Sequence, residues 1–164
     1  MRTFTLLKTR TAETLLQEIE QIQKRITERA YDLFRNRGAA LGTALNDWVA
    51  AERQTIWKPP VEVCQKDNQC VIEAALAGVE PRQLDIQVSR DTLLIKADTP
   101  HTHPETKGIV HVCEFQPGQL FRAITLPVPI DPEAVKAEYR DGLLRVTAAL
   151  AAKPQAKKVD VHAA

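Results

Sequence analysis

The sequence predicts a mainly β protein, an immunoglobulin-like antiparallel β-sandwich preceded by a helical N-terminal segment. Two changes along the chain support this prediction. All ten prolines follow Ile56, so the front of the chain is free of helix breakers and the back is punctuated by them. The spacing of apolar residues changes at the same point, from every third or fourth residue to every second residue.

The front of the chain has the spacing of two amphipathic helices. In the first, charged residues separate the apolar positions, and we expect Thr11 to cap its start and Gly38 to end it. The apolar positions are Leu15, Ile19, Ile22, Ile26, Ala30 and Leu33. A second, shorter helix is predicted from Leu41 to Gln54, with Trp48 on its apolar face. Two such helices cannot bury both apolar faces without each other or another surface.

The rest of the chain is predicted to form short strands separated by turns. Runs rich in β-branched residues alternate with turn residues, and no helical spacing occurs among them. The predicted strands cover residues 61–65, 70–76, 84–88, 92–97, 109–115, 119–126, 135–139 and 143–149. The last turn, Asp141-Gly142, is a two-residue hairpin signal because glycine tolerates positive φ. Many short strands at this spacing are typical of a sandwich.

This pattern divides the chain into three parts. Residues 1–56 form the helical N-terminal region, residues 57–150 the sandwich, and residues 151–164 a flexible C-terminal extension. The extension is rich in alanine and lysine and contains Pro154, which favours a tail without regular structure. It carries one apolar island, Val159-Asp160-Val161.

Composition excludes several classes of protein. The 22 basic residues nearly balance the 21 acidic ones, for a net charge of +1, which argues against nucleic-acid binding. No apolar run is long enough for a membrane span or a secretion signal, so we expect a cytoplasmic protein that binds no membrane. Three cysteines without CxxC spacing indicate free thiols. No glycine-rich phosphate loop occurs, so nucleotide hydrolysis is not expected.

Two groups of side chains invite a chemical interpretation, and each has a simpler one. His101, His103 and His111 could ligate a metal, but no cysteine or carboxylate stands at a supporting spacing. Cys113 lies two residues from His111, so the pair could be a nucleophilic thiol and its general base. The simpler explanation is that both are side chains of an interface between subunits. We therefore expect no enzyme activity, no bound metal and no cofactor.

The most specific segment of the β-rich part is AEYRDGLL at residues 137–144. It matches the A-x-x-x-n-G-x-L motif of one family through Ala137, Asp141, Gly142 and Leu144. Further matches are the Leu-Ala-Gly-Val of residues 76–79 followed by Pro81, and Arg122 ahead of Leu126-Pro127. On these residues the chain resembles the α-crystallin domain of the bacterial-type small heat-shock proteins, the Hsp20 family, over residues 57–150. The resemblance implies a structural role for the motif and a chaperone function for the protein.

The resemblance also implies a docking site for the C-terminal tail. Relatives carry a short I/V-x-I/V motif, which Val159 and Val161 match, and it docks into a groove on a neighbouring subunit. In an extended tail these two side chains point to one side, as docking at a sheet edge requires. The groove would lie between the strands at residues 84–88 and 135–139, with Leu84, Ile86, Val88 and Val135 lining it.

A second implied contact is a dimer formed by strand exchange. In bacterial and plant relatives the strand ahead of the QLFRAITL segment crosses to the partner's sheet. The corresponding residues here are Ile109, His111, Cys113 and Phe115. Many relatives carry a basic residue where this chain has Phe115, so an apolar contact is expected in place of an ion pair.

The helical front departs from the disordered arm of many relatives. The segments RAYDLFRNRG and NDWVAAER are similar to a small helical module of bacterial proteins of unknown function. The helix face formed by Leu15, Ile19, Ile22, Ile26, Leu33 and Trp48 is a candidate for binding clients or for assembly, and burial against a partner helix is the simplest interpretation.

The function expected from these features is ATP-independent capture of unfolded or partly folded client proteins, which keeps their apolar surfaces from aggregating. The oligomer would form through strand exchange and tail docking. The alternative is an adaptor similar to the co-chaperone CS domains, which binds one folded partner. Such domains lack the tail motif and usually act as monomers.

Overall fold

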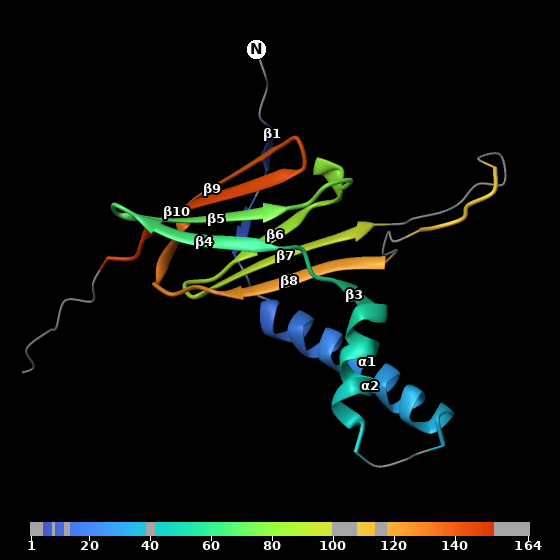
Figure 1. Cartoon of the computed structure of the whole chain (residues 1–164). Helices are drawn as coiled ribbons and strands as arrows, with labels where there is room; N and C mark the ends of the chain where they lie inside the picture. Colours follow the sequence, from blue (N-terminus) through green and yellow to red (C-terminus); the bar gives the residue numbers. More distant parts are fainter. Residues whose placement is uncertain are drawn as a thin grey trace, which may run out of the picture.

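The structure consists of two packed β-sheets with a pair of helices against one of them (Figure 1). It is a computed structural model that describes residues 5–7, 9–11, 14–38, 42–99, 108–113 and 118–152. In chain order the elements are β1 (Thr5–Leu7), β2 (Thr9–Thr11), α1 (Leu15–Asn36), α2 (Ala44–Thr55), β3 (Ile56–Trp57), β4 (Val61–Lys66), β5 (Gln69–Ala75), a 3₁₀ turn (Pro81–Gln83), β6 (Asp85–Val88), β7 (Thr92–Thr99), β8 (Gly118–Thr125), β9 (Ile130–Arg140) and β10 (Leu143–Leu150). The predicted fold class is confirmed.

Each sheet has five strands. Sheet A has the order β1-β9-β10-β5-β4, and sheet B has the order β2-β6-β7-β8-β3. Most neighbours are antiparallel, as expected, but β2 with β6 and β3 with β8 are parallel. The sequence did not predict β1, β2 or β3, because each has only two or three residues and therefore too little periodicity.

These three short strands cover the outer edges of longer ones. β1 pairs with β9, β2 with β6 and β3 with β8. The opposite end of sheet A is different, because there the outermost strand is β4, with six residues. Among the described residues, β4 is thus the longest strand that has one edge without a neighbour, and such an edge can add a strand from another chain.

Alternating side chains of the two sheets form the main core. On β5 the inward residues are Cys70, Ile72 and Ala74, and the outward ones between them are more exposed. The largest fully buried side chains include Ile72, Leu76, Ile86, Leu93, Ile95, Leu120, Ile130, Leu144 and Val146. Each such side chain contributes about 1.5–3 kcal/mol by leaving water, so this alternation is the main source of the sandwich's stability.

The Asp141-Gly142 turn joins β9 and β10 as predicted. Both residues have positive φ, 50° for Asp141 and 81° for Gly142, which is the geometry of a tight hairpin turn. The Gly142 carbonyl accepts a hydrogen bond of 2.6 Å from the Leu76 amide. A Cβ at Gly142 would lie 3.1 Å from the Cα of Ala77, so the turn is packed tightly on the loop after β5.

The two helices that the sequence predicts are both present, but each begins later than predicted. α1 ends at Asn36, and Gly38 follows in the left-handed region at φ 85°. The predicted cap Thr11 lies in β2, and the residue ahead of α1 is Thr14. α2 begins at Ala44, three residues after the predicted start at Leu41, which lies outside the described residues. Neither helix in the described part of the chain is long and apolar enough to cross a membrane.

The two helices pack on each other and on the outer face of sheet B. A second apolar cluster joins Leu15, Ile22 and Ile26 of α1 to Ala51, Ile56, Leu94 and Phe121. Leu94 and Phe121 come from β7 and β8 and point away from the main core. A guanidinium contact ties the hairpin together, because Arg37 Nη2 donates to Asp47 Oδ2 over 2.6 Å. This hydrogen bond holds the pKa of Asp47 below its usual value.

A polar network fixes the start of α1 to sheet B. Glu18 accepts hydrogen bonds from Lys96 Nζ at 2.7 Å and from Gln87 Nε2 at 2.9 Å, and Lys96 also contacts Asp85 at 3.1 Å. Burial alone would raise the pKa of Glu18, but these hydrogen bonds outweigh it and hold that pKa below its usual value. For Lys96, burial would lower the pKa and the two carboxylates raise it. The ionised forms of both groups are therefore favoured by folding.

We predict that Gly142→Ala destabilises the sandwich by about 1–3 kcal/mol, because alanine at positive φ is strained and its Cβ would crowd Ala77. Gly78→Ala is the matched control, since Gly78 has a similar φ of 86° and no atom within 4 Å of an added Cβ. Urea unfolding at one protein concentration measures both. If both variants lose the same free energy of unfolding, the contact with Ala77 adds nothing to the cost of the Gly142 substitution.

We predict that Glu18→Gln lowers the free energy of unfolding at pH 7 by about 1–2 kcal/mol, because Lys96 loses a charged partner. Since folding lowers the pKa of Glu18, its contribution is present above the unfolded value near 4.5 and is lost as pH falls through the folded value. The difference between the variant and the parent should therefore disappear in acid. Glu28→Gln, which removes an exposed pair 4.0 Å long with Lys24, should change little at any pH.

Candidate functional site

The predicted docking groove lies on one side of the sandwich, where β6 of sheet B faces β9 of sheet A. Ile86 and Val88 are buried in the main core, and Leu84 and Val135 are half-buried against it. All four predicted residues are therefore close to this core; Ile86 and Val88 lie on β6, Val135 lies on β9, and Leu84 directly precedes β6. Their role in docking is not tested by this arrangement and stays a prediction.

The N-terminal part of the chain covers this side of the sandwich. We name the described residues 5–7 and 9–11 the N-terminal strap. β1 pairs antiparallel with β9, placing Leu7 opposite Ala137, and β2 pairs parallel with β6, placing Thr9 opposite Ile86. The strap thus passes from one sheet to the other; its first strand is labelled β1 in Figure 1.

The strap contributes an apolar side chain and satisfies backbone groups. Leu7 is half-buried and packs against the main core. On β9, the strand that β1 covers, the Tyr139 hydroxyl lies 2.9 Å from the Leu76 carbonyl oxygen and 2.7 Å from that of Val79, with both oxygens as acceptors. Burial raises the pKa of Tyr139. In this structure the edges of β9 and β6 at the predicted groove are therefore covered by the chain's own N-terminal strap.

Sequence reasoning placed the strap in the helical region and missed it as a pair of strands. A weak signal was present, because Thr3-Phe4-Thr5-Leu6 alternates polar and apolar residues. Four residues of alternation occur often by chance, and only the two long strands beside the strap select the extended form.

The segment predicted to exchange between subunits forms no strand where the structure describes it. Residues 108–113 have no helix or strand, whereas a strand was predicted at 109–115. The physical reason is that no strand in the described part of the chain pairs with them. Ile109 and Val112 are 85% and 79% exposed, and His111 and Cys113 are also exposed. Phe115 lies outside the described residues, as do Val159 and Val161 of the tail.

The predicted client or assembly face of the helices covers the chain's own sheet. Leu15, Ile22 and Ile26 are buried, and Ile19, Leu33 and Trp48 are half-buried beside them. This face is thus not free to meet a client in the folded chain. The exposed apolar side chains of the hairpin are others, with Leu16 at 74% and Leu45 at 75%.

The predicted chemical groups do not gather into a reactive centre in the described part of the chain. His101 and His103 lie outside it, and no three of its His, Cys, Asp and Glu side chains group as metal ligands would. Cys70 is buried, which raises the pKa of its thiol, with Cys64 adding to the shift. His111 and Cys113 lie on an exposed segment without regular structure.

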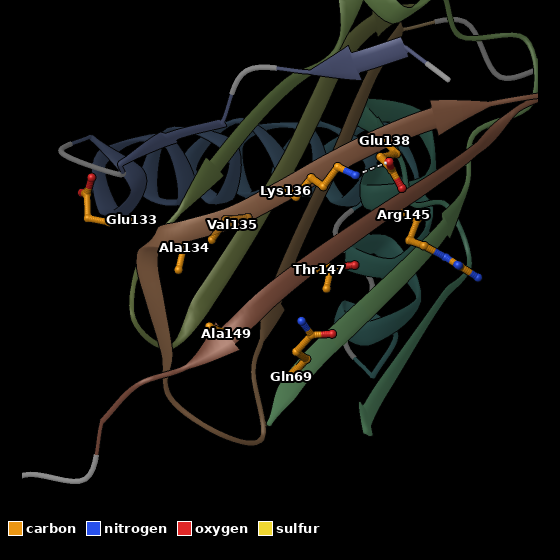
Figure 2. Close-up of a pocket in the computed structure, with 9 residues that line it drawn as sticks. All are labelled: Gln69, Glu133, Ala134, Val135, Lys136, Glu138, Arg145, Thr147 and Ala149. Atoms are coloured by element: carbon orange, nitrogen blue, oxygen red, sulfur yellow. Dashed lines mark ion pairs between the residues drawn. The ribbon is translucent and has the colours of Figure 1, made fainter. Parts of the chain in front are cut away.

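A shallow hollow lies on the outer face of sheet A, lined from β5, β9 and β10 (Figure 2). Its lining residues are Gln69, Glu133, Ala134, Val135, Lys136, Glu138, Arg145, Thr147 and Ala149. Lys136 Nζ contacts Glu138 Oε1 at 2.6 Å, and Arg145 pairs across the strands with Glu73. We assign no site to this hollow, because a charge pair along one strand and a charge pair between neighbouring strands are both ordinary on the solvent face of a sheet.

Comparison with known proteins gives two family matches. The sequence profile of the Hsp20/alpha crystallin family matches residues 62–162. A profile described as a protein of unknown function (DUF2934) matches residues 21–55, which include most of α1 and all of α2.

Individual relatives agree with the larger match. The probable 15 kDa heat shock protein of Leptospira interrogans is 29% identical over 111 residues, which cover 68% of this chain and 83% of that protein. Alpha-crystallin of Mycobacterium tuberculosis is 33% identical over 99 residues, which cover 59% of this chain and 66% of that protein.

Two solved structures share the fold. Heat shock protein 16.0 of Schizosaccharomyces pombe has a TM-score of 0.54 at 25% identity, over 65% of this chain and 99% of that chain. A small heat-shock protein of Xylella fastidiosa has a TM-score of 0.53 at 23% identity, over 65% of this chain and 98% of that chain. With the sandwich, the motif hairpin and a profile match over most of the chain in agreement, the protein belongs to the Hsp20/alpha-crystallin family of small heat-shock proteins.

Proposed function

We propose that this protein is an ATP-independent holdase, a chaperone that binds unfolding proteins and prevents their aggregation. The observation that carries the proposal is the family match over residues 62–162 together with the two-sheet sandwich of the described residues. Binding needs no nucleotide, because burying about 1000 Å² of apolar surface gives about 25 kcal/mol before the costs of association are subtracted. We expect clients to contact apolar side chains that the assembly leaves accessible.

The proposed dimer forms by exchange of residues 109–115. Two features of the described chain support it. Ile109, Val110 and Val112 are exposed although they are apolar and β-branched, which is unfavourable for a segment that stays in water. β4 ends sheet A and has one edge without a neighbour, so its backbone groups can pair with a strand from a second chain.

The proposed larger assembly forms when Val159 and Val161 dock on the β6 and β9 edges of another subunit. The geometry of the chain favours a neighbour over the chain's own groove. β10 ends with Leu150 opposite Ile130, and Ala137 lies about 23 Å further along β9. The nine residues from Leu150 to Val159 reach at most about 30 Å, and the tail would also have to reverse direction. A subunit alongside offers the same edges without this constraint.

We predict that the full-length chain suppresses the aggregation of a heat-labile client enzyme without added ATP. The physical reason is that its apolar surface competes with contacts between client molecules. Light scattering during heating measures the effect against an inert β protein of similar mass. Unchanged aggregation at several-fold molar excess would count against the holdase proposal, and a requirement for ATP would contradict its mechanism.

We predict that Val110→Pro shifts the solution mass from a dimer or multiples of a dimer toward the monomer. Proline removes a backbone donor that the exchanged strand needs for pairing. Because residue 110 lies in no helix or strand of the single chain, the sandwich should keep its circular dichroism spectrum. Val110→Thr, which retains the β-branched shape, is the control. Equal masses for both variants, by light scattering after size-exclusion chromatography, would exclude exchange through this segment.

A further inference from the structure

We propose that the N-terminal strap is an internal ligand of the groove between β6 and β9, and that the C-terminal tail binds this groove only by displacing it. The proposal rests on the tail docking proposed above and adds a competitor to it. The groove is then a site for extended segments with two occupants, one from each end of the chain.

The first support is the backbone pairing of the strap. Without it, β6 and β9 would each be an outermost strand with unpaired amide and carbonyl groups along one edge. β1 supplies partners along Ala137, Glu138 and Tyr139, and β2 supplies partners along Ile86, Gln87 and Val88. One strand edge pairs with one neighbour at a time, so a tail that adds to either edge at these residues must remove the strap from it.

The second support is the side-chain pattern of the strap. Leu7 and Thr9 are two residues apart, and both are half-buried. Leu7 packs against the main core on the same side of the sandwich as Ile86 and Val88. In sequence, Leu7 and Thr9 flank the charged Lys8, and Val159 and Val161 flank the charged Asp160, although Thr9 is less apolar than valine. Leu7 ends β1 on sheet A and Thr9 begins β2 on sheet B, so these two side chains lie where the strap passes from β9 to β6, which is also the place proposed for the tail motif.

The third support is the small size of the strap's ladder. Each of its strands pairs through only three residues, whereas β9 and β10 pair along most of their length. A short ladder can open without unfolding the sandwich, because none of the long strands depends on it. A tail of similar length can then replace the strap, and the groove exchanges one occupant for the other.

The test uses a disulfide that locks the strap in place. Positions 6 and 138 are partners across the β1–β9 pair, so Leu6→Cys with Glu138→Cys can be oxidised to hold β1 on β9. The host is the full-length chain with Cys64→Ser and Cys113→Ser, and with Val159→Asp and Val161→Asp, which stop its own tail from competing. The probe is a fluorescent peptide of residues 153–164, and its anisotropy reports binding to the oxidised and reduced host.

We expect the oxidised host to bind the peptide at least about tenfold more weakly than the reduced host, and a reductant to restore binding. A peptide with Val159→Asp and Val161→Asp should bind neither form, and the Leu6→Cys single variant should not respond to oxidation. Equal affinity of the oxidised and reduced hosts would overturn the competition while leaving tail docking in place. Peptide that binds neither form would overturn tail docking itself, and the competition with it.

A second variant tests the same competition without a disulfide. In the host with native residues at positions 6 and 138, Leu7→Asp places a charge against the main core and should release the strap. The peptide should then bind this variant more tightly than it binds the host with native Leu7. The apparent affinity should rise by the factor by which release of the strap increases the fraction of molecules with a free groove. Unchanged or weaker binding, with the sandwich still folded by circular dichroism, would contradict the proposal.

Discussion

The structure depends on how the strand edges of two open sheets are satisfied. Packing buries the inner faces of the sandwich, but it leaves the outermost strands with backbone groups that need partners. The N-terminal part of the chain provides three of these partners as strands of two or three residues, on β9, β6 and β8. The edge of β4 has no such cover in the described chain. The distribution of covered and open edges therefore indicates where other segments and other subunits can bind.

The helical hairpin has a related role at the face of a sheet. Leu94 and Phe121 point outward from sheet B and would be an apolar patch in a sandwich without the hairpin. α1 and α2 cover this patch with the face that the sequence marked as apolar, and Glu18, Gln87 and Lys96 fix the orientation of α1. The hairpin leads into β3 and follows β2, so it is attached to sheet B at both ends. Its packing resembles that of an integral layer more than that of a loose arm.

Much of this could be predicted from the sequence, for reasons that are local. The Asp141-Gly142 turn, the alternation in β5, β7 and β10, and the helical spacing from Leu15 to Leu33 each express a preference that a few neighbouring residues determine. The strand expected at 109–115 was assigned to a partner's sheet, and residues 108–113 form no strand in the single chain, because a strand also needs a neighbour that the local sequence does not supply. The sequence did not decide whether the apolar helix face binds clients, joins subunits or packs inside the chain. An amphipathic pattern shows that a face will be covered, but it does not identify the surface that covers it.

The sequence by itself determined the sandwich, its motif hairpin and the two helices, because spacing and turn chemistry act within short windows. Only the tertiary structure decided that residues 5–7 and 9–11 are strands and that they lie on β9 and β6. It also decided that the helix face covers Leu94 and Phe121. The physical reason is the same in both cases. A three-residue strand and an amphipathic helix become specific only through the surface they meet, and that surface comes from residues far along the chain.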